Sequence, residues 1–384
     1  MKLYFYEWKK LFFNKSFLII VMSLIIINIG FIGFDYKVNF VDKQLTHAQK
    51  HYSLKFAGQI TFEKVQDLKA EMDLIKTTPQ THYYSGGEEG DIMILEEIYN
   101  QMYDQYNYQK NNQDYLNMLL DNIEYFQTHH QQREAHYNQY IYNQYSNRNI
   151  TTFDYTLPFE KLFHYQETNI FILLSIVFAS AMMISLEKES QMLPLLKTSQ
   201  KGKKYLQRIK YFHNISLSIT IVLLFSLIEF ITFMSLYGFS GMNEPLYAIE
   251  GLLRTPISCT LLQFYLLLVG MRLLAFVFVG LIFLTLTQFI NNHFLCIITS
   301  ISIILFLYMG ISQVQLLNPL TLLNGINLFL NMKCIFIGDY CMFQYIWFLI
   351  VGIGWILLLS VIYFIRWEGI AHECQIRVFK TQKV

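Results

Sequence analysis

The sequence predicts an all-α polytopic membrane protein with six transmembrane helices and an extracellular helical domain between the first two. The chain has 384 residues, of which 54% are hydrophobic and only 15% are charged. With a mean hydropathy of +0.31, it is too apolar for an ordinary soluble domain. Six apolar stretches are each near the length of about 20 residues that crosses about 30 Å of hydrocarbon as a helix. Strand-like alternation is absent, and backbone groups in lipid must be satisfied internally, so helices are expected.

The chain begins with a basic amphipathic arm, 1–15, which we expect to be cytoplasmic. The following segment, 16–34 (SFLIIVMSLIIINIGFIGF), carries no charge. It is longer than the apolar part of a typical signal peptide, and no small-residue cleavage site follows it. We therefore predict that it is the first span and that it stays in the mature protein.

The polar region 35–168 is too large to be a loop, so we expect a helical domain there. Ile98, Met102 and Tyr106 recur at helical spacing. Within it, 101–145 is crowded with Tyr, Asn and Gln, which suits long amphipathic helices packed as a coiled pair.

A Gly86-Gly87 break is expected to separate two helical units of this region. Two interpretations of its surface stay open. The region can be a stalk or lid that packs on itself, which we favour. Alternatively, its tyrosines can form a surface that binds a substrate or a partner.

Five further spans complete the predicted bundle, at 169–186, 213–237, 261–290, 294–311 and 344–366. The fourth is long for a single span, so part of it is expected to be tilted or interfacial. Between these spans we predict a cytoplasmic segment at 187–212 and an extracellular re-entrant segment at 312–343. A cytoplasmic tail follows at 367–384.

Lysine and arginine set the orientation of the bundle. They gather in the N-terminal arm, in 187–212 and in the tail, whereas the short alternating loops, 238–260 and 312–343, hold only Arg254 and Lys333. Cytoplasmic loops carry the excess of basic residues. We therefore expect both termini in the cytoplasm.

No catalytic motif is recognisable. The chain lacks GxxxxGK[ST] and GxSxG, and Ile376 stands where HExxH needs its second histidine after His372. We expect a non-enzymatic chain that binds no cofactor, and the net charge of +1 gives no reason to expect nucleic acid.

Two groups of residues leave metal or disulfide chemistry open. His129, His130, Glu134 and His136 can share a helical face, but solvated histidines are the favoured interpretation over a metal site. Cys334 and Cys341 can pair in an oxidising compartment, or they are two unrelated thiols.

Two charges interrupt apolar runs, Glu229 in the third predicted span and Arg272 in the fourth. Each costs about 2.5–3.5 kcal/mol at mid-membrane, so both need partners. Both are predicted in the outer half of the membrane at similar depth. They either form a structural ion pair, which we favour, or line or gate an exit path.

A charged segment with a leucine-rich centre, LEKESQMLPLLKTSQKGKKYLQRIK, follows the second predicted span. Glu187 and Glu189 open it, and an apolar knob that suits a contact site is expected from Met192, Leu193, Leu195 and Leu196. The alternative is a basic amphipathic loop that lies on the lipids of the inner leaflet.

This segment resembles the one that follows the second span in ABC-2-type transporter permeases, where a short coupling helix docks on a cytoplasmic ATPase. Glu187, the Leu195-Leu196-Lys197-Thr198-Ser199 run, Gly202 and Lys210 carry the resemblance. The order of a basic arm, one span, an outside region and five more spans is similar to that family. Asn318-Pro319 before Leu322-Leu323 stands where such permeases have short re-entrant helices.

The outside region resembles a subgroup of Firmicutes permeases. The similar segments are Gly58 to Lys64 (GQITFEK) and Asn147 to Tyr155 (NRNITTFDY). The resemblance implies a bacterial cell membrane.

The resemblance also implies a function and partners. The chain would be the permease subunit of an ATP-driven exporter, paired with a second copy or a related permease, while a separate ATPase binds ATP and Mg. The substrate suggested is a peptide, in export of or immunity to an antimicrobial or toxin peptide, while lipid, drug and polysaccharide substrates stay open. The implied ATPase-coupling residues are Glu187, Glu189, Leu193, Leu195, Leu196, Lys197 and Gly202. From a different class, a membrane receptor or sensor with a ligand-binding outer domain stays open.

Overall fold

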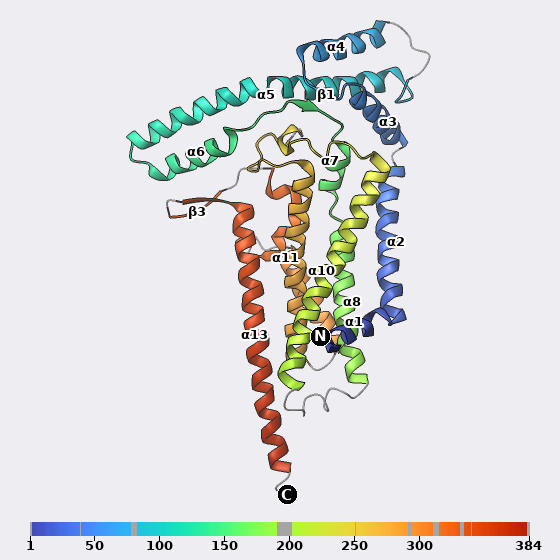
Figure 1. Ribbon diagram of the computed structural model, residues 1–384, viewed down its shortest axis with the longest axis vertical. Helices are drawn as coiled ribbons and strands as arrows, with labels where there is room; N and C mark the ends of the chain where they lie inside the picture. Colours follow the sequence, from blue (N-terminus) through green and yellow to red (C-terminus); the bar gives the residue numbers. More distant parts are fainter. Residues whose placement is uncertain are drawn as a thin grey trace.

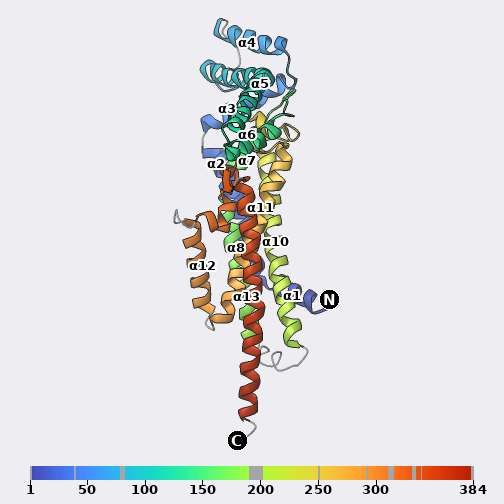
Figure 2. The same cartoon turned by 90° about the vertical axis from the view of Figure 1, so that its left-hand side faces the viewer.

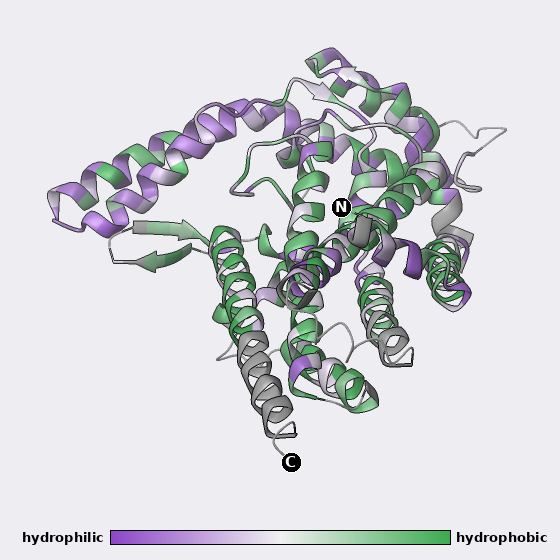
Figure 3. Cartoon of the chain, turned by 60° about the horizontal axis from the view of Figure 1, so that its bottom comes forward, coloured by the Kyte–Doolittle hydropathy of each residue, from purple (hydrophilic) through white to green (hydrophobic). Residues whose placement is uncertain are grey.

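The computed structural model shows an all-α membrane protein in which a bundle of long apolar helices carries a layer of more polar helices at one end (Figure 1). The structure describes residues 2–38, 40–77, 83–189, 202–249, 251–290, 293–309, 315–330, 334–338 and 340–381. Figure 3 shows apolar residues concentrated in the bundle and polar ones in the layer above it. This division follows from the apolar runs of the sequence, since hydrocarbon accepts apolar side chains and water accepts the rest.

The bundle contains seven of the described helices. They are α1 (Lys2–Phe12), α2 (Lys15–Val38), α8 (Thr168–Glu189), α10 (Gly202–Tyr237), α11 (Leu261–Phe289), α12 (His293–Met309) and α13 (Gln344–Thr381). The central one is α11, which packs against α8, α10, α12 and α13. Figure 2 shows α12 and α1 on opposite sides of the bundle.

Four helices, α2, α10, α11 and α13, are long and apolar enough to cross a membrane. A fifth crossing results if α7 (Leu157–His164) and α8 count as one span that is bent by 48°. Helix α12 has 17 residues, about 25 Å at 1.5 Å per residue, which is short of the hydrocarbon thickness. By length and composition, the described residues thus give four or five spans instead of the predicted six.

The polar layer, which we call the cap, comprises the helices α3 to α7. Besides α7, these are α3 (Phe40–Lys55), α4 (Phe62–Thr77), α5 (Glu88–Thr128) and α6 (Gln132–Tyr145). The helical character expected for this region is confirmed. Helices α5 and α6 pack against each other as a long antiparallel pair (Figure 1).

The expected break at the two glycines is also present. Gly86 has a φ of +83°, Gly87 occupies the position before the first turn of α5, and α4 has already ended at Thr77. After the break, the buried Asp91 accepts hydrogen bonds from the Ser85 amide (2.7 Å) and the Tyr52 hydroxyl (2.9 Å). These bonds fix α3 against the start of α5.

Two strand pairs were not expected. β1 (Gly58–Gln59) pairs antiparallel with β2 (Thr152–Phe153) in the cap. β3 (Cys334–Ile337) pairs with β4 (Tyr340–Phe343) just before α13. The second pair is a hairpin whose turn contains Gly338 at a φ of +63°, and the Gly-Asp dipeptide between two apolar runs was its sequence signal.

Two predicted boundaries differ from the structure. The basic residues from Gly202 onward, expected to precede the third span, already belong to α10, because a lysine- and arginine-rich segment continues a helix without cost. The segment predicted as re-entrant contains the 3₁₀ helices η2 (Gln315–Leu317) and η3 (Pro319–Leu328) in addition to the hairpin. The long stretch 261–290, part of which was expected to be tilted or interfacial, forms the single helix α11, which begins with a capping box of Thr260 and Gln263.

Candidate functional site

A buried ion pair joins the two charges of the bundle. The Arg272 guanidinium on α11 donates to both carboxylate oxygens of Glu229 on α10, with Nη2 at 3.2 Å from Oε1 and Nη1 bonded to Oε2. The side chain of Glu229 is fully buried and that of Arg272 is 12% exposed. The two-pronged contact satisfies both charges at once, which is what an apolar environment requires.

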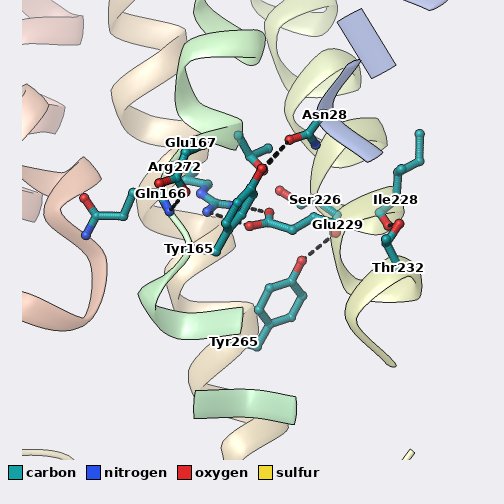
Figure 4. A network of polar contacts seen from close by, with 11 residues as sticks. Asn28, Tyr165, Gln166, Glu167, Ser226, Ile228, Glu229, Thr232, Tyr265 and Arg272 are labelled. Carbon is teal, nitrogen blue, oxygen red and sulfur yellow. Dashed lines mark hydrogen bonds and ion pairs between the residues drawn. The ribbon is translucent and has the colours of Figure 1, made fainter. Parts of the chain in front are cut away.

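Polar side chains from two more helices surround this pair (Figure 4). Asn28 of α2 accepts from the Tyr165 hydroxyl at 3.1 Å and from the Thr168 hydroxyl at 3.3 Å. The Tyr265 hydroxyl donates to the Ser226 carbonyl at 2.6 Å. Together these contacts tie α2, α8, α10 and α11 at one level, and we call this set the polar network.

A cavity of about 400 Å³ adjoins the polar network. It shares Tyr165 with the network, and its other polar lining comes from Asp35, Lys161, His164 and Glu167. Three phenylalanines complete the wall, at positions 31, 34 and 233. A cavity with apolar walls and a few converging charged groups is the usual form of a ligand site.

A second cavity, of about 330 Å³, lies between the bundle and the cap. Asp35 and Lys161 line both cavities, and Glu97 of α5 is added in the second. The two cavities are neighbours that share these two wall residues, and we call the pair of cavities the passage. Carboxylates outnumber lysines along it, so the passage favours a positively charged group.

The described residues of the expected coupling segment lie at the other end of the bundle. Glu187 and Glu189 are in the last turn of α8, and Gly202 is the first residue of α10. Figure 1 shows these helix ends, α1 and the C-terminal end of α13 far from the cap. Leu193, Leu195, Leu196 and Lys197 lie outside the described residues.

Helix α1 is docked on the first half of α10. The Tyr4 hydroxyl donates to Ser216 Oγ at 2.7 Å. The rings of Trp8 and Tyr4 meet the buried His213 edge-on, at 5.1 and 6.1 Å between centroids, and Leu11 is buried. The contacts hold the amphipathic arm against the same helix that carries Glu229.

Sequence reasoning found the two charges of the network and missed its neutral members. An asparagine in the middle of an apolar run, as at Asn28, is the signal that was available. Tyr165 and Thr168 carry no such signal, because they lie at the break between α7 and α8.

The histidine cluster and the cysteines are placed as follows. His129 stacks on Tyr125 with 4.1 Å between ring centroids. In the described part of the chain, no three His, Cys, Asp or Glu residues are arranged to hold a metal ion. Cys334 and Cys341 lie on neighbouring strands and are not joined by a disulfide.

Comparisons with known proteins identify no relative: no family model, no curated protein and no solved structure matches this chain.

Proposed function

We propose that this chain is the permease subunit of an ATP-driven exporter, with six spans, an extracellular cap and both termini in the cytoplasm of a bacterial cell. In this arrangement α8, which follows the bend after α7, and the short α12 are the second and fifth spans. ATP and Mg belong to a separate cytoplasmic ATPase, so the chain itself is not an enzyme. It would act as a dimer with a second copy or a related permease.

The observation that carries the proposal is the extent of α10. This single helix begins at Gly202, at the end of the coupling segment, and contains Glu229 of the polar network. At about 1.5 Å per residue, roughly 40 Å of helix connect the two. A push on the cytoplasmic end, where α1 is also docked, would therefore move the network as part of a rigid body.

The passage supports a peptide as substrate. Its carboxylates at Asp35, Glu97 and Glu167 suit a cationic group, and its phenylalanines suit an apolar one. Peptides that act on membranes combine both kinds of group, as amphipathic basic helices do. This agrees with export of, or immunity to, an antimicrobial or toxin peptide.

Co-purification tests the coupling. A candidate P-loop ATPase from the same genome is co-expressed with wild type, with Leu195→Glu, with Leu196→Glu and with the control Phe239→Glu. Phe239 is 66% exposed in the loop after α10, at the cap end, so its substitution places the same charge far from the expected contact.

We expect the two leucine variants to lose the ATPase while wild type and the control retain it. If wild type and all three variants retain the ATPase equally, 187–202 is only a loop bound to the lipids of the inner leaflet. If wild type binds no ATPase, the exporter proposal is wrong and the receptor or sensor hypothesis takes its place.

A further inference from the structure

A separate pocket in the cap has no part in the passage described above. It has a volume of about 290 Å³ and lies between α5, the end of α6 and the loop that precedes α11. Its size is close to the lower limit for small-molecule sites, so one or two residues of a peptide fit. We name it the tyrosine pocket, after Tyr108, Tyr115 and Tyr145 in its wall.

The aromatic walls of the pocket are fixed before any ligand arrives. Tyr115 meets Tyr145 edge-on at 5.5 Å, and Tyr108 stacks on Tyr247 at 5.4 Å. The Arg148 guanidinium lies over the rings of Tyr145 and Tyr247, at 3.8 and 5.0 Å from their centroids. Rigid tyrosines offer a large contact area at a small cost in conformational entropy.

Arg148 is a buried cation without an acidic partner among the residues that the structure describes. It is 4% exposed, and it donates only to neutral oxygens: Thr255 O at 2.7 Å, Ser258 Oγ at 2.9 Å and Gln144 O at 3.2 Å. Its Nη1 forms no hydrogen bond of normal geometry, and neither does the buried hydroxyl of Tyr108. Arg148 nevertheless lies near enough to that hydroxyl to oppose the rise in the Tyr108 pKa that burial causes. A buried charge is normally paired, so the described part of this region lacks an anion for Arg148.

A second arginine stands at the pocket itself. Arg254 lines the cavity, is exposed, and forms no ion pair with any residue that the structure describes. One carboxylate, Asp104, lines the opposite wall on α5. With Arg148 behind the wall and Arg254 at its edge, positive charge outweighs negative charge among the described residues around the cavity.

We propose that the tyrosine pocket binds the carboxylate of a peptide outside the membrane, with Arg254 contacting the carboxylate and the tyrosine rings packing against the adjoining residue. Arginine forms two parallel hydrogen bonds to a carboxylate, which gives both strength and orientation. Arg148 acts as a positioning residue, because it holds the ring of Tyr145 and adds positive potential. The proposal goes beyond the exporter function and holds equally for a receptor.

The test uses the full chain in nanodiscs and saturation-transfer difference NMR. The probes are a mixture of N-acetylated tripeptides with free C-terminal carboxylates and the same mixture with C-terminal amides. Arg254→Gln removes the contact charge, and Arg133→Gln is the matched control, since Arg133 is an exposed arginine of α6 whose guanidinium lies over Phe336 instead.

We expect the free carboxylates to bind wild type and Arg133→Gln alike, and Arg254→Gln to lose at least tenfold in affinity, as the loss of a charge-assisted pair implies. The amides should bind at least tenfold more weakly than the carboxylates. If the pocket binds a side-chain carboxylate instead of the C-terminal one, the amides that carry an acidic side chain are the exception. Equal binding of all carboxylates and amides, equal binding by Arg254→Gln, or no binding at millimolar peptide would each overturn the proposal.

Discussion

At the scale of single residues, buried charges in this protein differ in how they are satisfied. Glu229 and Arg272 neutralise each other, whereas Arg148 relies on neutral oxygens and aromatic faces. Glu244, in the loop between α10 and α11, is buried with Oε2 unpartnered. Because each charge is compensated differently, substitution should have different consequences at each.

Neutralising one member of the ion pair should destabilise the bundle. Arg272→Met leaves a buried carboxylate without a partner, at a cost of about 3–5 kcal/mol, and Glu229→Gln leaves a buried guanidinium. The double substitution should cost less than either one, because no unpaired charge remains. Thermal unfolding in detergent measures these differences.

A charge swap, Glu229→Arg with Arg272→Glu, should recover part of the loss in the same assay. Additive losses in the double variants would mean that the two side chains do not act as a pair.

Glu244 should make one contact between the cap and the bundle sensitive to pH. This contact, which we call the joint, lies between the loop that joins α10 to α11 and the cap segment at Thr152 and Asp154. Burial raises the pKa of Glu244 to about 7, with a hydrogen bond from Thr152 opposing the shift and the nearby Asp154 adding to it. While the joint is closed, the Glu244 carboxyl therefore keeps its proton between about pH 4.5 and 7. In the opened joint the same carboxyl has lost its proton over this range. The contribution of Glu244 to the free energy of the closed joint is largest below this pH window. It falls by on the order of 3 kcal/mol as the pH rises through the window, and it does not change further above it.

Hydrogen exchange of the Leu261 amide, which donates to the Glu244 carbonyl, reports the opening of this joint. Relative to Glu244→Gln at the same pH, wild type should lose protection between pH 5 and pH 8. Parallel behaviour of the two proteins over this range would contradict the prediction.

At the scale of elements, close contact between α10 and α11 depends on a glycine. A Cβ atom at Gly280 would lie 2.6 Å from Ser218 Oγ and 3.0 Å from Asn214 Nδ2. Those side chains are held by hydrogen bonds, from Ser218 to the Asn214 carbonyl at 3.0 Å and from Ser180 to Asn214 Oδ1 at 3.1 Å. The helices can therefore approach only because this position has no side chain.

Gly280→Ala should cost about 1–3 kcal/mol through overpacking. Gly270→Ala is its control on the same helix, since a Cβ atom there meets nothing within 4 Å, and it should be neutral or slightly stabilising. Melting temperatures of the two variants in detergent make the comparison. Equal melting temperatures would show that α10 and α11 accommodate the added methyl group without loss of stability.

At the scale of the whole molecule, the coupling end and the cap lie at opposite ends of the bundle (Figure 1). Cysteines introduced one at a time into a cysteine-free chain report which side each end faces. We expect an impermeant maleimide to label Asn107→Cys and Leu316→Cys on intact cells. Lys203→Cys and Asn292→Cys should react only after permeabilisation, because the six-span arrangement puts them inside.

The pair at 292 and 316 decides whether the short helix α12 crosses the membrane. If the cysteines at 292 and 316 are both labelled on intact cells, α12 does not cross the membrane. Labelling at 203 on intact cells would reverse the proposed orientation.

The sequence alone determined the membrane class, the helical cap and the break at Gly86 and Gly87. Hydropathy over about 20 residues is a local sum, and a glycine pair interrupts a helix wherever it stands, so neither needs knowledge of the fold. The count of spans was less secure for the same reason. A local sum does not register that a helix is bent, as at α7 and α8, or that α12 ends after 17 residues.

Only the tertiary structure decided which polar groups meet. Glu229 and Arg272 are 43 positions apart, and Asn28 lies 137 positions from Tyr165. Whether such side chains touch depends on how each helix is rotated about its axis and on which helices become neighbours. Those choices come from packing between distant segments, and no window along the chain contains them.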